Sequence, residues 1–428
     1  MLRARSMNPF RSSLCVAVSL ALLAAAEPND PRLTPAERAT WKALEQRMAA
    51  AAPTHALWLT NGLGLLGWLK GETNGVVRWE APFGADGRWA MRFARGDLSH
   101  AQVTEQPAPS INYCDVSFQL EFPDLRLIRR PPYSLLTDEP PQSAERYLDV
   151  LQKLHTNFVA RFGGLTGGLG LPDHVQVLLL TDEAAFRAYR KKSALRQSNL
   201  MGFYQMATQR LVVFDQRYTA AMDDILARLA WQGEKSQVQA RSDADADQIR
   251  LFFLAQACGA MREAEGGNLR ILRHEGAHQL FHTSGILAEG ATPGWLAEGL
   301  AQWYETFAPG SVSFELSSRL KAALERQRLI PLAELLGHRS KSQQGFYDGD
   351  RQADLAYAEA WSLVRLLLQP SRQEKFFDYL KYLRRLENAP DLRRTPPLDL
   401  LCRFLGGTPA ELETRWKESI EKLPFEPE

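Results

Sequence analysis

The chain has 428 residues, 45% of them hydrophobic and 24% charged, which is an ordinary composition for a globular protein. A disordered chain, a collagen-like fibre and a small disulfide-rich domain are therefore excluded. The formal net charge is only +1, and no polybasic tract follows residue 26. Neither nucleic-acid binding nor an electrostatic membrane anchor is expected from such a sequence.

The N-terminal residues 1–26 have the three parts of a secretory signal peptide. Three arginines precede an apolar run over 14–26, which ends in Ala24-Ala25-Ala26. This run is too short to span a bilayer, and Cys15 at its start does not fit a lipoprotein cleavage site. We expect an exported protein of 402 residues (428 − 26), periplasmic or extracellular and without a transmembrane anchor.

Cysteine usage argues against a disulfide framework. Beyond the signal, the chain has Cys114, Cys258 and Cys402, an odd number without a Cys-x-x-Cys pair. At most one bridge can form among them, and we expect no essential disulfide. Cys258 lies in an apolar helical run over 251–261, where we expect it to be buried as a small hydrophobic residue.

The N-terminal third alternates between helical and strand patterns. Residues 33–51, within an N-terminal segment 27–52, predict a short alanine-rich helix. Asn-Gly and Asp-Gly dipeptides then recur between apolar runs, and they supply the positive φ that two-residue hairpins require. We expect 53–104 to form a small β-barrel-like module. Over 105–130 we expect a proline-marked linker and one half-buried strand, since apolar and polar residues alternate at 116–122.

The remainder, 131–424, predicts one α+β domain. It has a strand at 133–137, an amphipathic helix with apolar positions from 147 to 162, and a continuously apolar strand at 175–180. Residues 201–214 indicate a hairpin at a sheet edge, and the chain beyond 219 is mainly helical. The expected architecture is a mixed sheet followed by a helical active-site and C-terminal subdomain.

A possible metal site begins at 274–278, which read His-Glu-Gly-Ala-His inside a helix-compatible segment. Histidines four residues apart lie on one face of a helix, so both imidazoles can bind one metal while Glu275 lies beside them. The alternative is that His274 and His278 are merely hydrogen-bonded histidines on a buried helix face. His282 continues the spacing, but a fourth protein ligand would close the position that a catalytic zinc keeps open, so we expect a structural or pocket-lining role.

The third ligand is expected from a second helix. Thr292 is a plausible N-cap and Pro293 a favoured first-turn residue, and Glu298 follows one turn later. Two histidines and one glutamate are a standard ligand set for catalytic zinc, which leaves a fourth position for water. Glu289, in the intervening loop, is a weaker competitor. We expect one Zn²⁺ per chain.

The segment 269–305 resembles the active site of gluzincin metallopeptidases, specifically peptidase MA-like families of unknown function. The resemblance is carried by His-Glu-x-x-His at 274–278 and by Trp-Leu-Ala-Glu-Gly at 295–299. Gly202, Phe203 and Tyr204 before a strand, and the later helix at 357–361, extend it over about 131–424. It implies a zincin-like fold with zinc on His274, His278 and Glu298, and with Glu275 as the general base.

Two further roles follow from the resemblance. Thermolysin-like relatives carry an aspartate four residues after the ligand glutamate, where this chain has Gln302, so Glu305 is the candidate to orient a zinc histidine. A later phenol or imidazole commonly faces the zinc, which implicates Tyr357 as a donor to the oxyanion. The alternatives are that Tyr357 is only the first core residue of its helix, or that Tyr347 is the donor.

The expected function is a zinc-dependent peptide hydrolase of the cell envelope, acting on a peptide or protein substrate. The edge strand with Gly202, Phe203 and Tyr204 could hold an extended peptide by β-addition. One alternative is a catalytically silent zincin that uses its β-barrel-like module for binding. Another is a metallohydrolase with a non-peptide substrate, since the motif specifies water activation and says little about the bond attacked. The sequence predicts no oligomeric state.

Overall fold

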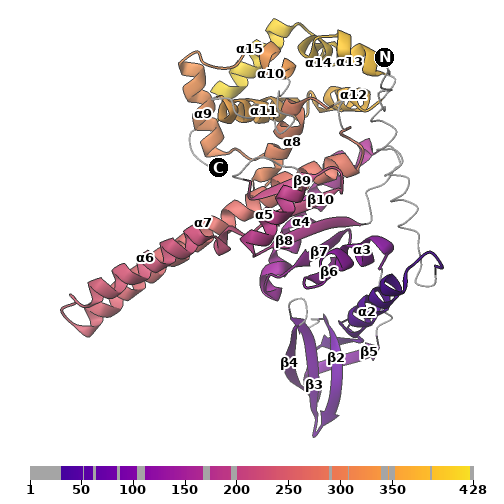
Figure 1. Cartoon of the computed structure of the whole chain (residues 1–428), viewed down its shortest axis with the longest axis vertical. Helices are drawn as coiled ribbons and strands as arrows, with labels where there is room; N and C mark the ends of the chain where they lie inside the picture. Colours follow the sequence, from indigo (N-terminus) through magenta and orange to yellow (C-terminus); the bar gives the residue numbers. More distant parts are fainter. Residues whose placement is uncertain are drawn as a thin grey trace, which may run out of the picture. The chain divides into compact units, whose positions relative to one another are not determined.

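The computed structural model describes residues 30–424, with gaps at 52, 61–63, 84–86, 104–110, 167–173, 194–199, 289–291, 307, 339–345, 347–351 and 386–387. The predicted signal peptide and the proline-marked linker therefore lie outside the described residues. The chain divides into two compact units, one ending at Leu148 and the other running from Asp149 to Glu428. Their helices and strands are labelled in Figure 1.

The first unit begins with α2 (Pro35–Ala51), which confirms the predicted N-terminal helix. An antiparallel sheet in the order β4-β3-β2-β1-β5 follows. Its strands are β1 (His55–Leu59), β2 (Gly64–Thr73), β3 (Val76–Phe83), β4 (Gly87–Ala94) and β5 (Leu98–Val103).

The predicted Asn-Gly turn between β2 and β3 is confirmed, because Asn74 and Gly75 have φ of 53° and 71°. The barrel-like closure that we expected for this module is not observed. Among the described strands, β4 pairs only with β3 and β5 only with β1, so the sheet is open. Turn dipeptides specify which neighbouring strands pair, but they carry no information on whether the outermost strands meet.

The strand expected at 116–122 was wrong, because this segment is helix α3 (Tyr113–Glu121). A capping box begins it: the Asn112 side chain accepts from the backbone N–H of Asp115, and the Asp115 carboxylate accepts from the N–H of Asn112. The buried residues form adjacent pairs, 115–116 and 118–119, which is a helical pattern. The antiparallel strands β6 (Arg126–Arg130) and β7 (Tyr133–Thr137) follow, the second as predicted.

The second unit has a mixed sheet, as predicted. Helix α4 (Pro141–Phe162), which contains the boundary between the units, precedes β8 (Val175–Leu180), α5 (Glu183–Lys192), β9 (Gly202–Gln205) and β10 (Arg210–Phe214). Strand β10 pairs parallel with β8 and antiparallel with β9, and β9 is the last strand in the order. Strand β10 is buried throughout, which agrees with the apolar sequence of a strand covered on both faces.

After the short turn η3 (Gln216–Tyr218), the chain forms a long helical hairpin of α6 (Ala220–Gln237) and α7 (Asp243–Thr283). The two helices lie side by side (Figure 1). Gly233 helps them approach, since a Cβ there would already lie 3.4 Å from the Phe253 side chain. The last third of α7 leaves the hairpin and contacts β9 and β10.

The rest of the chain is helical, as predicted, and packs around one large hydrophobic core that includes Trp295, Trp361 and Trp416. The helices are α8 (Gly294–Glu305), α9 (Phe314–Glu325), α10 (Leu332–Gly337), α11 (Ala353–Leu367), α12 (Gln373–Leu383), α13 (Ala389–Arg394), α14 (Pro397–Leu405) and α15 (Pro409–Glu421). Among the residues that the structure describes, no helix is both long and apolar enough to cross a bilayer.

Among the described residues, no disulfide joins Cys114, Cys258 and Cys402. The expectation that Cys258 is buried was wrong, because its side chain is exposed. At this position α7 packs on α6, and the opposite face of the helix meets solvent. The apolar sequence around Cys258 therefore suggested burial, but in the hairpin α6 covers only one face of α7.

Candidate metal centre

The predicted motif lies in the buried last third of α7. His274 and His278 occupy consecutive turns on one face, with ring centroids 4.9 Å apart. The opposite face carries Gly276, where a Cβ would lie 2.7 Å from a methyl group of Leu154 on α4. Glycine thus lets α4 pack closely against α7, and the histidine face is directed towards α8.

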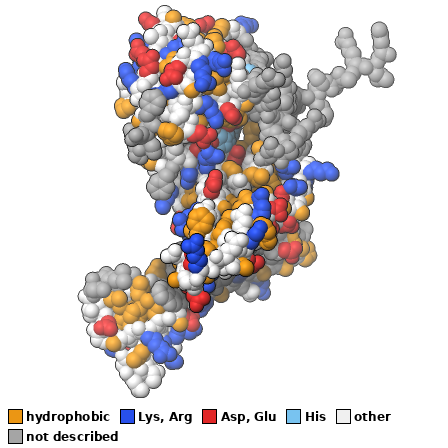
Figure 2. Space-filling view, turned by 90° about the vertical axis from the view of Figure 1, so that its left-hand side faces the viewer, with side chains coloured by type: hydrophobic (Ala, Val, Ile, Leu, Met, Phe, Trp, Pro, Cys, Tyr) orange, Lys and Arg blue, Asp and Glu red, His pale blue; other side chains and the backbone are white. Residues whose placement is uncertain are grey.

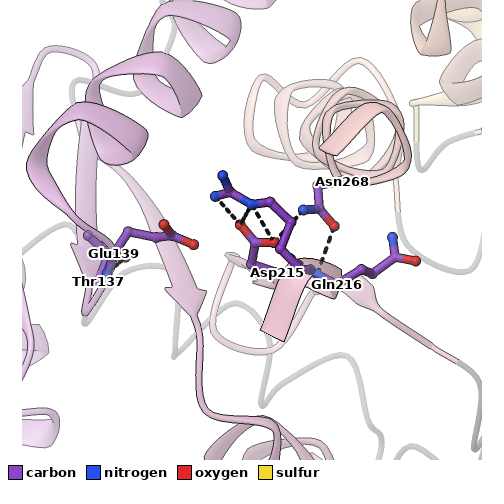
Figure 3. Close-up of polar contacts among 6 residues, drawn as sticks. Thr137, Glu139, Asp215, Gln216 and Asn268 are labelled. Atoms are coloured by element: carbon purple, nitrogen blue, oxygen red, sulfur yellow. Dashed lines mark hydrogen bonds and ion pairs between the residues drawn. The ribbon is translucent and has the colours of Figure 1, made fainter. Parts of the chain in front are cut away.

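Two buried amides fix α7 on either side of the motif. Before it, Asn268 donates to the Asp215 carboxylate over 2.7 Å and accepts from the backbone N–H of Gln216 over 3.0 Å (Figure 3). After it, the Gln279 side chain donates to the backbone carbonyls of Gln176 and Gln209, each over 2.8 Å. These bonds join the helix to the ends of the sheet strands, so the two histidines are held in position by the sheet.

The third predicted ligand comes from α8. Glu298 lies in the second turn of this helix, and Gly299 follows it at the closest approach to α11, where a Cβ would lie 2.6 Å from the Ala360 carbonyl oxygen. Helix α8 begins one residue later than predicted, with Pro293 rather than Thr292 as the N-cap. The Thr292 hydroxyl instead donates to the carbonyl oxygen of Ala288 and accepts the N–H of Ala288.

The three predicted ligands converge. Nε2 of His274 lies 3.2 Å from Nε2 of His278 and 3.2 Å from Oε2 of Glu298, and the His278-to-Glu298 distance is 3.5 Å. With zinc–ligand bonds of about 2.05 Å, two ligands of a tetrahedral zinc lie about 3.3 Å apart. The three atoms therefore match one face of a zinc tetrahedron. Glu289, the competing ligand, lies outside the described residues.

Glu305 contacts the first histidine from the end of α8. Its Oε1 lies 2.7 Å from Nδ1 of His274, while its backbone carbonyl accepts from Nε of Arg273 over 2.8 Å. In the neutral imidazole, a hydrogen bond from Nδ1–H leaves Nε2 without a proton, which is the tautomer that a metal ligand needs. The side-chain amide oxygen Oε1 of Gln302 is buried, and no donor in the described part of the chain forms a hydrogen bond to it.

Glu275 is held by the edge strand. Its Oε2 accepts the backbone N–H of Tyr204 on β9 over 2.8 Å. This approach depends on Gly202, where a Cβ would lie 2.5 Å from the Ile271 side chain of α7. Gly202, Phe203 and Tyr204 thus belong to the strand that lies against the motif helix.

Burial and neighbouring charges shift the pKa values of His274, Glu298 and Glu275. Burial opposes protonation of His274, but hydrogen bonds to Glu298 and Glu305 outweigh burial and raise its pKa well above the usual value. Burial also acts to raise the pKa of Glu298, but the nearby histidines outweigh it and hold the pKa far below the usual range. For Glu275, burial prevails over the two histidines and raises the pKa.

His282 lies beside the site without joining the three ligands. Its ring stacks on Tyr204, with centroids 5.6 Å apart and planes 19° apart. Burial lowers the pKa of His282 to about 4, so its ring is neutral near pH 7. His282 is not among the three grouped ligands, and the structural or pocket-lining role expected for it stays a prediction.

Tyr357 lies at the start of the second turn of α11, half-buried, with its ring 5.7 Å from that of Phe346 in an edge-to-face arrangement. Phe346 in turn contacts the start of α8, because a Cβ on Gly294 would lie 3.0 Å from its ring. Tyr357 therefore lies close to the helix that carries Glu298. Its competitor, Tyr347, lies outside the described residues.

Comparison with known proteins adds one finding. Residues 268–388 match a family described as a protein of unknown function (DUF1570). The match begins at the buried Asn268 of α7 and spans the His-Glu-x-x-His motif, α8 and α11. No curated protein matches the chain.

The two buried amides that fix α7 were not identified from the sequence. Asn268 lies six residues before the motif and Gln279 directly after it, and a buried amide in an apolar helix requires partners. That signal is present, but its partners lie between 52 and 103 residues away along the chain. Nothing local in the sequence identifies them.

Proposed function

We propose that the chain is a zinc-dependent peptide hydrolase of the gluzincin type, exported to the cell envelope. The observation that carries the proposal is the geometry of three atoms, Nε2 of His274, Nε2 of His278 and Oε2 of Glu298, spaced as a tetrahedral zinc requires. Two histidines and one glutamate leave a fourth position open for water or substrate.

Glu275 supports hydrolysis over a silent binding module. It is not among the three grouped ligands, yet a backbone N–H donated by the edge strand holds its carboxylate beside them. When bound, zinc would polarise the scissile carbonyl and lower the pKa of a water molecule towards neutrality. Glu275 accepts the proton of this water and delivers it to the leaving amine. We assign Tyr357 to the oxyanion as a hydrogen-bond donor.

Strand β9 supports a peptide substrate over a non-peptide one. Phe214 on β10 donates its N–H to the carbonyl of Met201, whereas Tyr204 donates its N–H to Glu275. Backbone groups alternate in direction along a strand, so those of Gly202 and Tyr204 face away from β10. Their carbonyl oxygens are acceptors for an extended peptide added at this edge.

The experiment is a peptide-library digest by the purified, zinc-loaded protein beside its Glu275→Gln form. We expect cleavage products from the first and none above background from the second, with equal zinc content in both. A zinc-loaded wild type that cleaves no peptide, but hydrolyses a non-peptide ester or amide, would contradict the peptide assignment. Equal activity in both forms would contradict the role of Glu275.

A further inference from the structure

The α6–α7 hairpin carries large apolar side chains on its surface. Leu251 and Leu254 of α7 are 59% and 56% exposed, and Trp231 of α6 is 59% exposed. Figure 2, which faces the side of the molecule from which the hairpin projects, shows hydrophobic side chains gathered on the surface. Exposed apolar patches of this kind mark interaction sites.

On α7 four exposed residues form one stripe, and the exposed Phe252 lies beside it. Leu251, Leu254, Ala255 and Cys258 are spaced i, i+3, i+4 and i+7, which places them on one face of a helix. Phe253, two residues from Leu251, packs instead on Gly233 of α6. Two residues correspond to about 200° around a helix, so the stripe faces away from α6.

Charges of opposite sign end the stripe. Asp247 lies four residues before Leu251, and Arg262 lies four residues after Cys258, so both belong to the same face. Asp247 is 64% exposed and makes an ion pair of 3.1 Å with Arg250 of its own helix. Such an exposed pair contributes little, so it does not prevent Asp247 from pairing elsewhere.

The stripe is complementary to a second copy of itself in the antiparallel direction. A two-fold axis between Leu254 and Ala255 places Leu251 opposite the partner copy's position 258 and Asp247 opposite position 262. Every apolar residue then meets an apolar residue, and each acid meets a base. Self-complementarity of this kind is the requirement of an isologous two-fold interface, and the 3–4 spacing is that of a coiled-coil seam.

The same axis fits the length of the hairpin. Helix α7 is free of the sheet from Asp243 to Gly267, a stretch of roughly 37 Å at 1.5 Å per residue, before Asn268 ties it to Asp215. The midpoint of this stretch is Ala255, beside the proposed axis. An antiparallel pair therefore lays the tip of each hairpin beside the root of the other over the full free length.

We propose that the protein forms a two-fold dimer in which the α7 stripes of two chains pack antiparallel, with the stripe defined by Asp247, Leu251, Leu254, Ala255, Cys258 and Arg262. A lipid surface is a poorer occupant. The hairpin tip carries Asp243, Asp245 and Asp247 within the first turns of α7, and these carboxylates would be repelled by anionic headgroups.

The first test measures the mass of the purified protein in solution by sedimentation velocity over a range of concentrations. We expect a dimer whose affinity falls roughly hundredfold in Leu254→Asp, since the change buries one unpaired charge per chain at the axis. Val238→Asp is the matched control, because Val238 is 87% exposed on the hairpin but outside the stripe. A wild type that stays monomeric, or a dimer unaffected by Leu254→Asp, would overturn the proposal.

A charge exchange tests the register. Asp247→Arg and Arg262→Asp should each weaken the dimer alone, because each places two like charges opposite one another at both ends. An equal mixture of the two variants should restore it, because the mixed pair again has an acid opposite a base at each end. Failure of the mixture to associate more tightly than either variant would contradict the antiparallel register.

Disulfide cross-linking to the native Cys258 tests whether the two α7 helices pair antiparallel or parallel. In Leu251→Cys, mild oxidation should link position 251 of one chain to Cys258 of the other, and Cys258→Ser in that background should abolish the link. Disulfides that join 258 to 258 or 251 to 251 would indicate parallel pairing and would overturn the proposal. Peptide mapping by mass spectrometry separates these products.

Discussion

Tyr204 on the edge strand donates its backbone N–H to the carboxylate of Glu275 on the motif helix, over 2.8 Å. One bond thus links the strand proposed to bind substrate with the proposed general base. This hydrogen bond occupies one oxygen of the Glu275 carboxylate and fixes the orientation of the carboxylate group. Because the donor is a main-chain group, side-chain substitution at 204 leaves it in place, and Glu275 is the residue through which the arrangement is tested.

Glu275→Gln should abolish peptide hydrolysis while zinc content stays near one ion per chain. The amide keeps the size and the acceptor oxygen for Tyr204, but it cannot take a proton from water. Turnover and metal content are measured on the same preparation. Loss of zinc together with activity would show that Glu275 acts on the ligands instead of on the water.

Zinc binding should depend on His278 and Glu298 far more than on their neighbours. His278→Ala and Glu298→Ala each remove one of three ligands, so we expect metal analysis to find little zinc in either after dialysis. The loss should also lower the thermal midpoint of the zinc-supplemented protein towards that of the chelated wild type. Full zinc occupancy in both variants would contradict the assignment.

Glu305→Ala should weaken zinc affinity by about 10- to 100-fold, the usual effect of removing the group that orients a ligand histidine. Gln302→Ala on the same helix is the matched control, because the contact to Nδ1 of His274 comes from Glu305. Competition with a chelator of known affinity measures both. Equal losses in the two variants would indicate a general effect on α8.

The grouping of His274, His278 and Glu298 was the most predictable part of the fold, for a geometric reason. The i, i+4 spacing of His274 and His278 brings the rings together on any helix, so no tertiary information was needed. Glu298 required only that a second helix start near 293, which its cap and proline signalled. The amides Asn268 and Gln279 could not be placed, because their partners are distant in the sequence.

Errors arose where one local signal was compatible with two structures. Residues 116–122 alternate as a strand would, but the Asn112–Asp115 capping box begins a helix there. The exposed Cys258 was expected in a core because its helix is apolar, whereas the hairpin leaves that face open. Periodicity alone cannot decide between helix and strand at 116–122, or between a buried and an exposed side chain at Cys258, since both depend on what packs against the segment.

Glu359 should make stability fall as pH rises. It is fully buried on α11, where Oε1 accepts the N–H of Ile330 over 2.9 Å, and burial raises its pKa from 4.5 to about 8. The folded state therefore binds this proton more tightly than the unfolded state. The resulting stability is complete below the unfolded pKa of 4.5 and is lost as pH rises through about 8.

Glu359→Gln removes this dependence, because the amide keeps an acceptor for Ile330 and cannot ionise. Between about pH 5 and 8, its free energy of unfolding should exceed that of wild type by an amount that grows by up to about 1.4 kcal/mol per pH unit. Urea unfolding at several pH values measures the gap. Glu418→Gln, exposed on α15, is the control and should show no such trend.

Tyr357→Phe distinguishes a donor to the oxyanion from a core residue. The ring contacts Phe346, which itself packs on the start of α8, so the aromatic part is already accounted for by packing. The substitution keeps that ring and removes only the hydroxyl. Loss of one oxyanion donor typically costs ~2.7–4 kcal/mol, or roughly a hundred- to thousandfold in turnover.

A core role instead predicts little change in turnover. Tyr379→Phe supplies the comparison, because Tyr379 is fully buried in the same helical core. We expect Tyr357→Phe to lose turnover with zinc retained, and Tyr379→Phe to keep it. If turnover of Tyr357→Phe stays within about threefold of wild type, the hydroxyl is not the donor. Tyr347→Phe then becomes the variant to measure, because Tyr347 is the tyrosine in the segment between α10 and α11.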